Sequence, residues 1–562
     1  MTPETFANAT WADIRPYYDA LAARPLDRAG VDAWLAEWSA LEEALDEAEA
    51  LATIAHTTDT GNPDKEAAAL RFTSEIAPQI QEQNVRLGRR LIDLADSRED
   101  LATTIRRFKN TAALFREENV PLHAEIARLS SEYNKITGGM TVEWEGQELP
   151  LPRLRPFLLS QDRAVRERAF RAQSSPYVAR RDDLADVFDR MFAVRTQLAK
   201  NAGFASYRDY AHQAKHRFDY TPADCERMHD AVERAVVPAV ARLRARRRDA
   251  MRVETLRPWD LDVDPAGRPA LKPFDDVATL VARARGIFTR LDPTLGRYFD
   301  TMADERLLDL DSRKGKRPGG YCATLSYRGR PFIFMNAAGV HDDVTTLMHE
   351  SGHAFHAFES QRLPFIFQRN VGMEIAETAS MSMELLTAPY LAAARGGFYS
   401  DADAQRARYE HLEGILEFLP YMCAVDAFQH WLYTSGEGHD RDARDAAWLR
   451  IHARFDPGVD WTGLEAERRA RWHRQLHVFL YPFYYVEYGI AQLAALQVWR
   501  NALGDHAGAL AAYRRALALG ATKTLPELFA AAGAALVFDP AEMGALVSLV
   551  EEHMMVGTLR EA

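Results

Sequence analysis

The sequence His349-Glu350-Ser351-Gly352-His353 decides how this chain of 562 residues is interpreted. In a helix, residues four positions apart lie on one face, so His349 and His353 can bind a single metal ion together. Glu350 directly follows the first histidine and can face the open coordination position of that ion. The pattern H-E-x-x-H is typical of zinc hydrolases, in which the two histidines hold zinc and the glutamate handles the proton of a water molecule.

The residues around this pattern favour a helix. Asp342 or Asp343 can cap its start, where acidic charge is favourable. Gly352 costs about 1 kcal/mol relative to alanine inside a helix, so it indicates close packing or access at that position. The alternative interpretation is a pair of surface histidines that hold no metal.

A catalytic zinc ion needs three protein ligands and a water, so the two histidines require a third partner. Residues 374–384 predict a helix with Glu374, Glu377 and Glu384 on one face. Glu377 is the best-centred third ligand, and the other two glutamates are placed to orient the histidines through hydrogen bonds. Apolar neighbours in this segment indicate burial, which argues against the alternative of a solvated acidic face.

Composition and charge exclude several classes of protein. The formal net charge of −12 argues against nucleic acid as the main partner, because phosphate binding needs a basic face. The three cysteines, Cys225, Cys322 and Cys423, lie far apart, so they suggest neither a disulfide framework nor a cysteine metal site. The first residues lack a secretory signal, and no window approaches 18 uninterrupted apolar residues. We therefore expect a soluble cytoplasmic protein without a membrane partner.

The chain before the H-E-x-x-H pattern predicts mostly helices. Apolar periodicity from residue 11 to about 109 predicts a helical scaffold, and residues 141–149 predict a small β-hairpin that turns near Glu145-Gly146. A long helix is expected from Pro222, with Thr221 as its cap. It would carry the arginine-rich run of residues 242–248, which we interpret as a solvated face.

Two further segments near the pattern could take part in catalysis. Residues 320–336 predict a hairpin that turns at Arg328-Gly329, and its edge strand either binds an extended peptide or is structural only. Residues 477–488 contain a histidine and four tyrosines, and Pro482 is expected to start a helix there. Imidazole and phenol groups can stabilise an oxyanion, although an aromatic stripe is also typical of a protein core.

The motifs together resemble the thimet oligopeptidase/oligoendopeptidase F family of zinc metallopeptidases, and most closely its oligoendopeptidase F and Pz-peptidase branch. The order and separation of the motifs carry the resemblance through the C-terminal half of the chain, in residues 318–321, 331–334, 342–356, 377–384 and 481–488. In this chain Val478-Phe479-Leu480 precedes the first tyrosine, where some relatives have a glycine-rich loop.

The resemblance implies a mainly α fold: an elongated, neurolysin-like and zincin-like helical shell with a deep substrate channel and small β-hairpins near the active site. It also implies one Zn²⁺ ion per chain, held by His349, His353 and Glu377, with Glu350 as general base. The implied catalytic donors are His477, Tyr481 and Tyr488. The implied substrate-binding residues are Gly319, Gly320, Tyr321 and Tyr485.

From the resemblance we expect a zinc-dependent oligoendopeptidase that cleaves internal bonds of short unfolded peptides. We expect an N-terminal helical domain over residues 1–200 that covers the channel, and a catalytic domain over residues 201–562. Two alternatives stay open: a metallocarboxypeptidase, and a non-catalytic helical peptide-binding protein with a structural zinc. The oligomeric state stays open as well.

Overall fold

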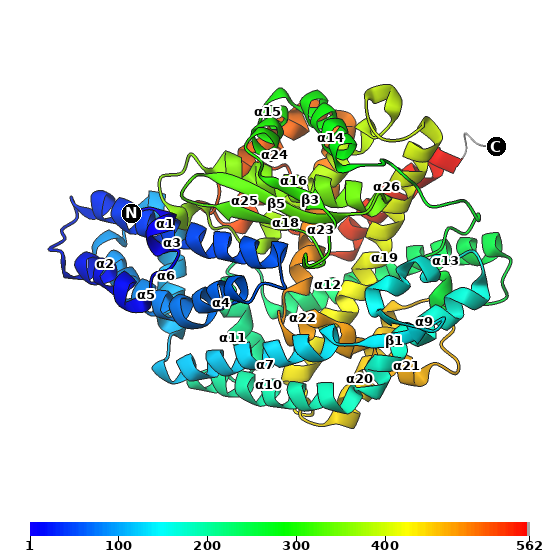
Figure 1. Cartoon of the computed structure of the whole chain (residues 1–562), viewed down its shortest axis with the longest axis horizontal. Helices are drawn as coiled ribbons and strands as arrows, with labels where there is room; N and C mark the ends of the chain where they lie inside the picture. Colours follow the sequence, from blue (N-terminus) through cyan, green and yellow to red (C-terminus); the bar gives the residue numbers. More distant parts are fainter. Residues whose placement is uncertain (559–562) are drawn as a thin grey trace. The chain divides into compact units, whose positions relative to one another are not determined.

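The computed structural model describes residues 1–558, which are mainly helical with two small sheets (Figure 1). The mainly α fold predicted from the sequence is confirmed. The chain divides into two compact units, each made of three segments. Unit 1 consists of Met1–Phe115, Leu271–Arg408 and Ile490–Leu536, and unit 2 consists of Arg116–Ala270, Tyr409–Gly489 and Val537–Ala562. The domain boundary expected after residue 200 stays a prediction.

Unit 1 contains an N-terminal group of helices and a group around a three-stranded sheet. Its N-terminal helices are α1 (Pro3–Phe6), α2 (Trp11–Ala23), α3 (Val31–Thr58), α4 (Pro63–Arg71), α5 (Ala77–Ala95) and α6 (Ala102–Leu114). Its other helices are α14 (Val277–Leu291), α15 (Pro293–Asp304), α16 (His341–Ser360), α17 (Ile366–Arg369), α18 (Met373–Thr387), α24 (His506–Ala518) and α25 (Leu525–Ala531).

The three-stranded sheet contains the hairpin that the sequence predicts next to the H-E-x-x-H pattern. Strands β4 (Tyr321–Leu325) and β5 (Arg330–Ala337) pair antiparallel, and β4 lies at an edge because the strand order is β3-β5-β4. Strand β3 (Leu308–Asp311) pairs parallel to β5 and is not predicted by the sequence. Helix α16 packs against both hairpin strands and against α18. Its Leu347 and Phe355 share one core with Ile333 of β5.

Unit 2 contains a second group of helices and a two-stranded sheet. Its helices are α7 (Val120–Gly138), α8 (Arg155–Leu158), α9 (Arg163–Ala179), α10 (Arg181–Asn201), α11 (Tyr207–Ala214), α12 (Pro222–Ala235), α13 (Val237–Met251), α20 (Arg441–Phe455), α21 (Glu465–Arg474), α22 (Leu476–Phe479) and α26 (Pro540–Thr558). Two long helices, α19 (Asp401–Thr434) and α23 (Tyr485–Gly504), contribute residues to both units.

The predicted hairpin near residue 145 is present in unit 2. Strands β1 (Thr141–Trp144) and β2 (Gln147–Pro150) pair antiparallel. The two residues between them, Glu145 and Gly146, both have positive φ, at 51° and 80°. Such a two-residue turn matches the right-handed twist of the flanking strands.

The helix expected from Pro222 is shorter than predicted, and the arginines that follow are not simply a solvated face. The helix ends at Ala235, and α13 begins at Val237 with a proline in its first turn, where the missing N–H costs least. Arg244 and Arg247 are buried and pair with Asp456 at 2.6 Å and with Glu413 at 3.0 Å. These two arginines therefore connect α13 to parts of unit 2 that are distant in the sequence.

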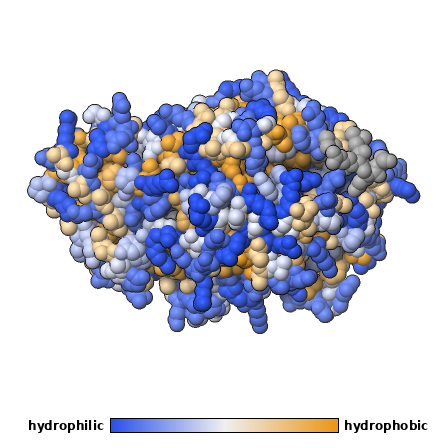
Figure 2. Space-filling view, turned by 90° about the horizontal axis from the view of Figure 1, so that it is seen from above, coloured by the Kyte–Doolittle hydropathy of each residue, from blue (hydrophilic) through white to orange (hydrophobic). Residues whose placement is uncertain are grey.

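The hydropathy of the surface and of the helices matches the charged composition of the chain. Hydrophilic side chains cover much of the face seen in Figure 2, with apolar side chains between them. Over residues 1–558, every helix is either too short or too polar to span a lipid bilayer.

Candidate active site

Helix α16 carries the two histidines on one face, as the four-residue spacing predicts. Its start is capped by Asp343, one of the two aspartates expected there. The Oδ2 atom of Asp343 accepts hydrogen bonds from the backbone N–H groups of Ala338 at 2.8 Å and Val340 at 2.9 Å. These bonds satisfy donors that the loop before the helix would otherwise leave unpaired.

The structure brings His349, His353 and Glu377 together, with one ligand atom of each within 4.8 Å of the others. The Oε2 atom of Glu377 lies 3.4 Å from Nε2 of His349 and 3.6 Å from Nε2 of His353. Ser380 Oγ donates to the same Glu377 oxygen at 3.1 Å. Two imidazole nitrogens and a carboxylate oxygen are the donors of a three-ligand catalytic zinc site, so the residues present fit that ion.

Gly352 permits the close approach of α16 and α18 that brings these three residues together. A Cβ atom at Gly352 would lie 2.5 Å from Cα of Ser380 and 2.6 Å from the carbonyl oxygen of Ala379. Both are backbone atoms of α18, which cannot move aside as a flexible side chain would. The close packing that the sequence indicates at this glycine is therefore present.

Glu384 supports the first histidine from further along α18. Its Oε1 atom lies 2.6 Å from Nδ1 of His349, which leaves Nε2 of that ring facing Glu377. Burial lowers the pKa of His349, but hydrogen bonds to Glu377 and Glu384 outweigh burial and raise that pKa well above its usual value. Burial lowers the pKa of His353 to about 4. Glu374 is also buried, and its carboxylate lies beside Gly372.

Glu350, on α16, faces the edge strand β4. Burial raises the pKa of its carboxyl to about 7, with smaller and opposing effects from His349 and Glu377. The carboxylate also accepts a hydrogen bond from the backbone of Cys322 in β4. A carboxyl group with a pKa near neutrality can both accept and return a proton at neutral pH.

The predicted substrate-binding residues Gly319, Gly320 and Tyr321 form the entry to β4. Gly319 has φ of 102°, and a Cβ at Gly320 would lie 3.1 Å from Cγ2 of Thr346 in α16. The hydroxyl group of Tyr321 lies 2.6 Å from Oγ1 of Thr57, and its ring stacks on Phe334. The start of the strand is therefore held by α3 and β5, and Gly320 lets it approach the helix that carries the histidines.

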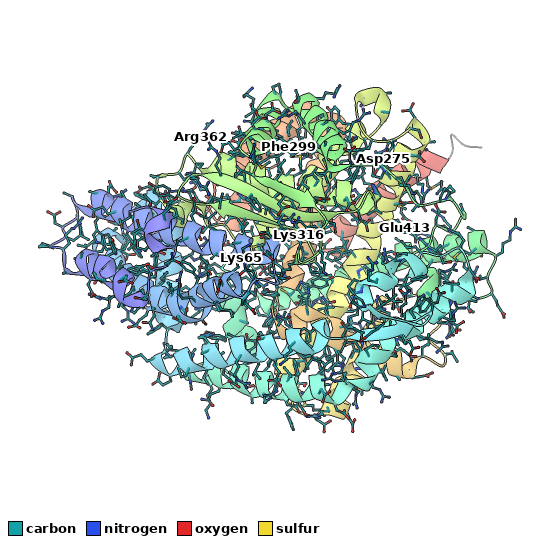
Figure 3. The ribbon with its side chains drawn as sticks, in the orientation of Figure 1. Lys65, Asp275, Phe299, Lys316, Arg362 and Glu413 are labelled. Carbon is teal, nitrogen blue, oxygen red and sulfur yellow. The ribbon has the colours of Figure 1, made fainter. Side chains whose placement is uncertain are left out.

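Lys316, which precedes β4, has a structural role. Its Nζ is buried and donates to Asp309 Oδ1 and to the carbonyls of Asp309, Asp311 and Met335. Figure 3 labels it beside the sheet. The basic segment before the hairpin therefore joins β3 to β5.

The predicted oxyanion donors form an aromatic cluster in unit 2. The ring of His477 lies 4.5 Å from that of Tyr485, 6.2 Å from that of Tyr488 and 6.4 Å from that of Tyr481, measured between centroids. Gln475 Nε2 donates to Nδ1 of His477 at 2.7 Å, and burial lowers the pKa of this histidine to about 4. At neutral pH the ring is therefore neutral and carries its proton on Nε2, where it can donate.

The prediction that Pro482 starts a helix is wrong. Helix α23 begins at Tyr485, because Phe483 has φ of 61° and so cannot belong to a right-handed helix. The N–H group of Phe483 donates to Oε1 of Gln429 at 2.8 Å, and its carbonyl accepts from the guanidinium of Arg217. Tertiary contacts thus hold a conformation that the local sequence does not favour.

Two buried arginines that the sequence does not single out hold this tyrosine segment. Arg195 donates to the carbonyls of Val478 and Phe479, and Arg217 pairs with Glu487. Neither arginine lies in a motif, so nothing in the sequence signals its burial. Their effect is to satisfy carbonyls at the end of α22 and in the turn before α23.

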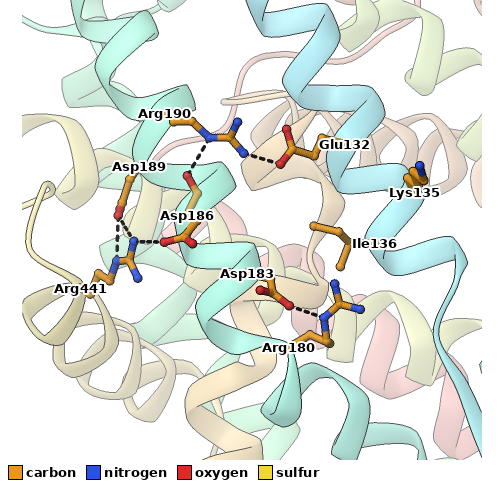
Figure 4. A pocket seen from close by; sticks show the side chains of 9 residues that line it. All are labelled: Glu132, Lys135, Ile136, Arg180, Asp183, Asp186, Asp189, Arg190 and Arg441. Atoms are coloured by element: carbon orange, nitrogen blue, oxygen red, sulfur yellow. Dashed lines mark hydrogen bonds and ion pairs between the residues drawn. The ribbon is translucent and has the colours of Figure 1, made fainter.

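A hollow of about 640 Å³ in unit 2 does not coincide with either group of predicted residues (Figure 4). Its charged side chains largely pair with one another: Arg190 with Glu132, Arg180 with Asp183, and Arg441 with Asp186 and Asp189. Mutually paired charges of this kind are typical of a solvated surface rather than of a catalytic site.

Solved structures and curated sequences resemble this chain. The structure called PZ peptidase A with inhibitor 2 superposes with a TM-score of 0.90 at 26% identity and covers 98% of both chains. A structure assigned to oligoendopeptidase F gives a TM-score of 0.90 at 29% identity over 99% of both chains. Oligopeptidase PepF of Bacillus subtilis is 23% identical over 71% of this chain, and the match spans 58% of PepF.

Two models of protein families match the sequence, one near its N-terminus and one over most of the remaining chain. The model described as the peptidase M3 N-terminal domain matches residues 4–111, and the model described as peptidase family M3 matches residues 157–541. The second match contains the His-His-Glu cluster, Glu350, strand β4 and the tyrosine segment. The resemblance inferred from the motifs is thereby confirmed, and this chain belongs to peptidase family M3.

Proposed function

We propose that this chain is a zinc-dependent oligoendopeptidase that hydrolyses internal bonds of short unfolded peptides. One observation carries the proposal: His349, His353 and Glu377 converge, while Glu350 on the same helix as the histidines faces an edge strand. Peptides as substrates follow from the family. Their short length, the internal position of the bond and the zinc ion are the proposal.

The chemistry divides between the ion and the residues of the chain. One bound Zn²⁺ would polarise the scissile carbonyl and make a water molecule more acidic. Glu350 takes the proton of the attacking water and returns it to the leaving amine nitrogen. In the protein without metal, burial raises its pKa to about 7, which favours uptake of a proton from water.

Substrate is proposed to bind as an additional strand on β4. This strand lies at an edge of its sheet, and edge strands bind extended peptides through main-chain hydrogen bonds. A peptide added here runs past Glu350, which contacts the backbone of Cys322 in the same strand. Gly319, Gly320 and Tyr321 hold the start of the strand and are its proposed contacts with substrate.

His477, Tyr481 and Tyr488 are proposed to donate hydrogen bonds to the oxyanion, and Tyr485 to bind substrate. The family resemblance supports these roles, as does the neutral His477 ring with its proton on Nε2. Donors aimed at a developing negative charge typically contribute about 10²–10³ in kcat each.

The substitution Glu350→Gln tests the proposal. We expect it to retain zinc but to reduce cleavage of an internally quenched peptide by about 10²–10⁴-fold, the usual contribution of a general base. Asp342→Asn, in the first turn of the same helix, is the matched control and should retain activity. Near-wild-type turnover by the Glu350 variant would refute the assignment.

The cleavage products separate the alternatives. A peptide blocked at both ends should be cut internally, as mass spectrometry of the products will reveal. A metallocarboxypeptidase would leave this peptide intact and cut only the version with a free C-terminus. A non-catalytic protein with a structural zinc would cut neither. The expectations of a cytoplasmic location and of no nucleic-acid or membrane partner stay predictions.

A further inference from the structure

Four titratable side chains form a buried cluster in unit 2, on helices α12 and α19. Cys225 and His229 lie one turn apart on α12, and Asp426 and His430 lie one turn apart on α19. All four are buried, with exposed fractions of 1%, 4%, 0% and 7% respectively. Each helix therefore presents a pair of metal-binding side chains at the spacing that places both on one face.

The distances bring three of these residues to one point. One ligand atom each from Cys225, Asp426 and His430 lies within 4.8 Å of the other two. The fourth residue, His229, lies beside them, and its ring centroid is 5.3 Å from that of His430. A thiolate, a carboxylate and an imidazole are all established ligands of zinc.

Asp426 supplies an independent sign that a ligand belongs here. Its Oδ2 atom lies 2.8 Å from Nε2 of His229 and 3.4 Å from Nε2 of His430. Its Oδ1 atom is buried and has no hydrogen-bond partner among the residues that the structure describes. A fully buried carboxylate normally has partners on both oxygens, so the unpartnered Oδ1 atom of a residue in this three-ligand group points to a cation as its partner.

We propose that Cys225, Asp426 and His430 bind a second divalent metal ion of the zinc type, with His229 holding the Asp426 carboxylate in place. Hydrogen bonds from a neighbouring side chain commonly orient a metal-ligating carboxylate in this way. The thiolate and the carboxylate together balance the two positive charges of the ion, so no uncompensated charge is buried. The ion would join α12 to α19 and thereby stabilise unit 2. This proposal does not depend on the proposed peptidase activity.

Zinc counting on full-length protein tests the proposal. The double substitution His349→Ala with His353→Ala removes the proposed catalytic ligands, and this variant should still bind about one zinc ion per chain. Adding Cys225→Ser or Asp426→Asn should reduce the zinc content to near zero. Cys423→Ser is the matched control, because Cys423 is a buried cysteine of α19 outside the three-ligand group, and it should leave the content unchanged.

The absorption spectrum with bound Co²⁺ provides a second measurement that does not depend on the zinc content. In the double-histidine variant, Co²⁺ should give a thiolate-to-cobalt charge-transfer band that Cys225→Ser abolishes and Cys423→Ser retains. Circular dichroism identifies any variant that fails to fold. The proposal is overturned if the double-histidine variant binds no metal, if Cys225→Ser retains the metal and the band, or if both cysteine variants lose the metal equally.

Discussion

Replacing Gly352 with alanine should weaken zinc binding more than it lowers the stability of the protein. The added Cβ would lie 2.5 Å from Cα of Ser380, whereas carbon atoms in contact lie about 3.5–4.0 Å apart. Helices α16 and α18 must therefore move apart locally by about 1 Å. Because α18 carries Glu377 and α16 carries both histidines, this movement acts directly on the distances between the three ligands.

Two effects on stability oppose each other. Alanine is favoured over glycine inside a helix by about 1 kcal/mol. Overpacking against a backbone that cannot move aside costs about 1–3 kcal/mol. The free energy of unfolding of the metal-free protein should therefore fall by about 0–2 kcal/mol, a modest loss. Zinc binding should suffer more, because ligand distances in a zinc site tolerate changes of only about 0.2 Å.

We expect Gly352→Ala to weaken zinc binding by about tenfold or more, measured by competition with a chelator, and to lower peptidase activity at limiting zinc. Gly414→Ala is the matched control, since Gly414 lies in helix α19 and a Cβ there meets nothing within 4 Å. That variant should melt at the same or a higher temperature and bind zinc normally. Unchanged zinc affinity in Gly352→Ala would contradict the inference that this close approach sets the ligand geometry.

Three further outcomes follow from the structure. Glu384→Gln should weaken zinc binding by about 10–100-fold in the same chelator competition, because it replaces the charged partner of His349 Nδ1. Tyr488→Phe should lower kcat by about 10²–10³ while changing KM far less; an effect confined to KM would assign the phenol to substrate binding alone. Asp260 is buried, but hydrogen bonds from Arg163 and Arg166 outweigh burial and lower its pKa. Its stabilising contribution is therefore present above about pH 4 and is lost as the pH falls toward the lowered pKa. Asp260→Asn should reduce the difference in urea stability between about pH 5 and about pH 3, and an unchanged difference would rule out this role for the carboxylate.

Local patterns in the sequence are sufficient to predict much of the candidate metal site. The four-residue spacing of His349 and His353 predicts a shared helical face, and the structure has that face. The hairpin before α16 is predicted from alternating residues and a turn at Arg328-Gly329, and β4 and β5 pair in that way. The close packing indicated by Gly352 is also present. The first two features are determined by residues within a few positions of one another, and the third is signalled by a glycine inside a helix.

Features that depend on distant partners are not predicted, or are predicted wrongly. Phe483 adopts a positive φ because Gln429 and Arg217 hold its backbone, and nothing next to Pro482 indicates this. Arg244 and Arg247 look solvated in a run of arginines, yet their carboxylate partners lie 212 and 166 positions away respectively. Strand β3 has four residues and pairs parallel to β5, so it leaves almost no periodic signal.

The same limit explains why one candidate metal cluster is apparent from the sequence and the other is not. Both use two residues four apart on one helix, together with a ligand from a second helix. His349 and His353 form a recognisable motif, and the helix that carries Glu377 follows soon after them. In the second cluster the two helices are distant in the chain, since His229 of α12 and Asp426 of α19 are 197 positions apart. The wide spacing of the cysteines in the sequence argues against a cysteine metal site. In the folded chain, however, Cys225 lies close to Asp426 and His430. A metal ion binds wherever suitable ligand atoms lie close together in the folded chain. Spacing along the sequence can therefore reveal a metal site but cannot exclude one.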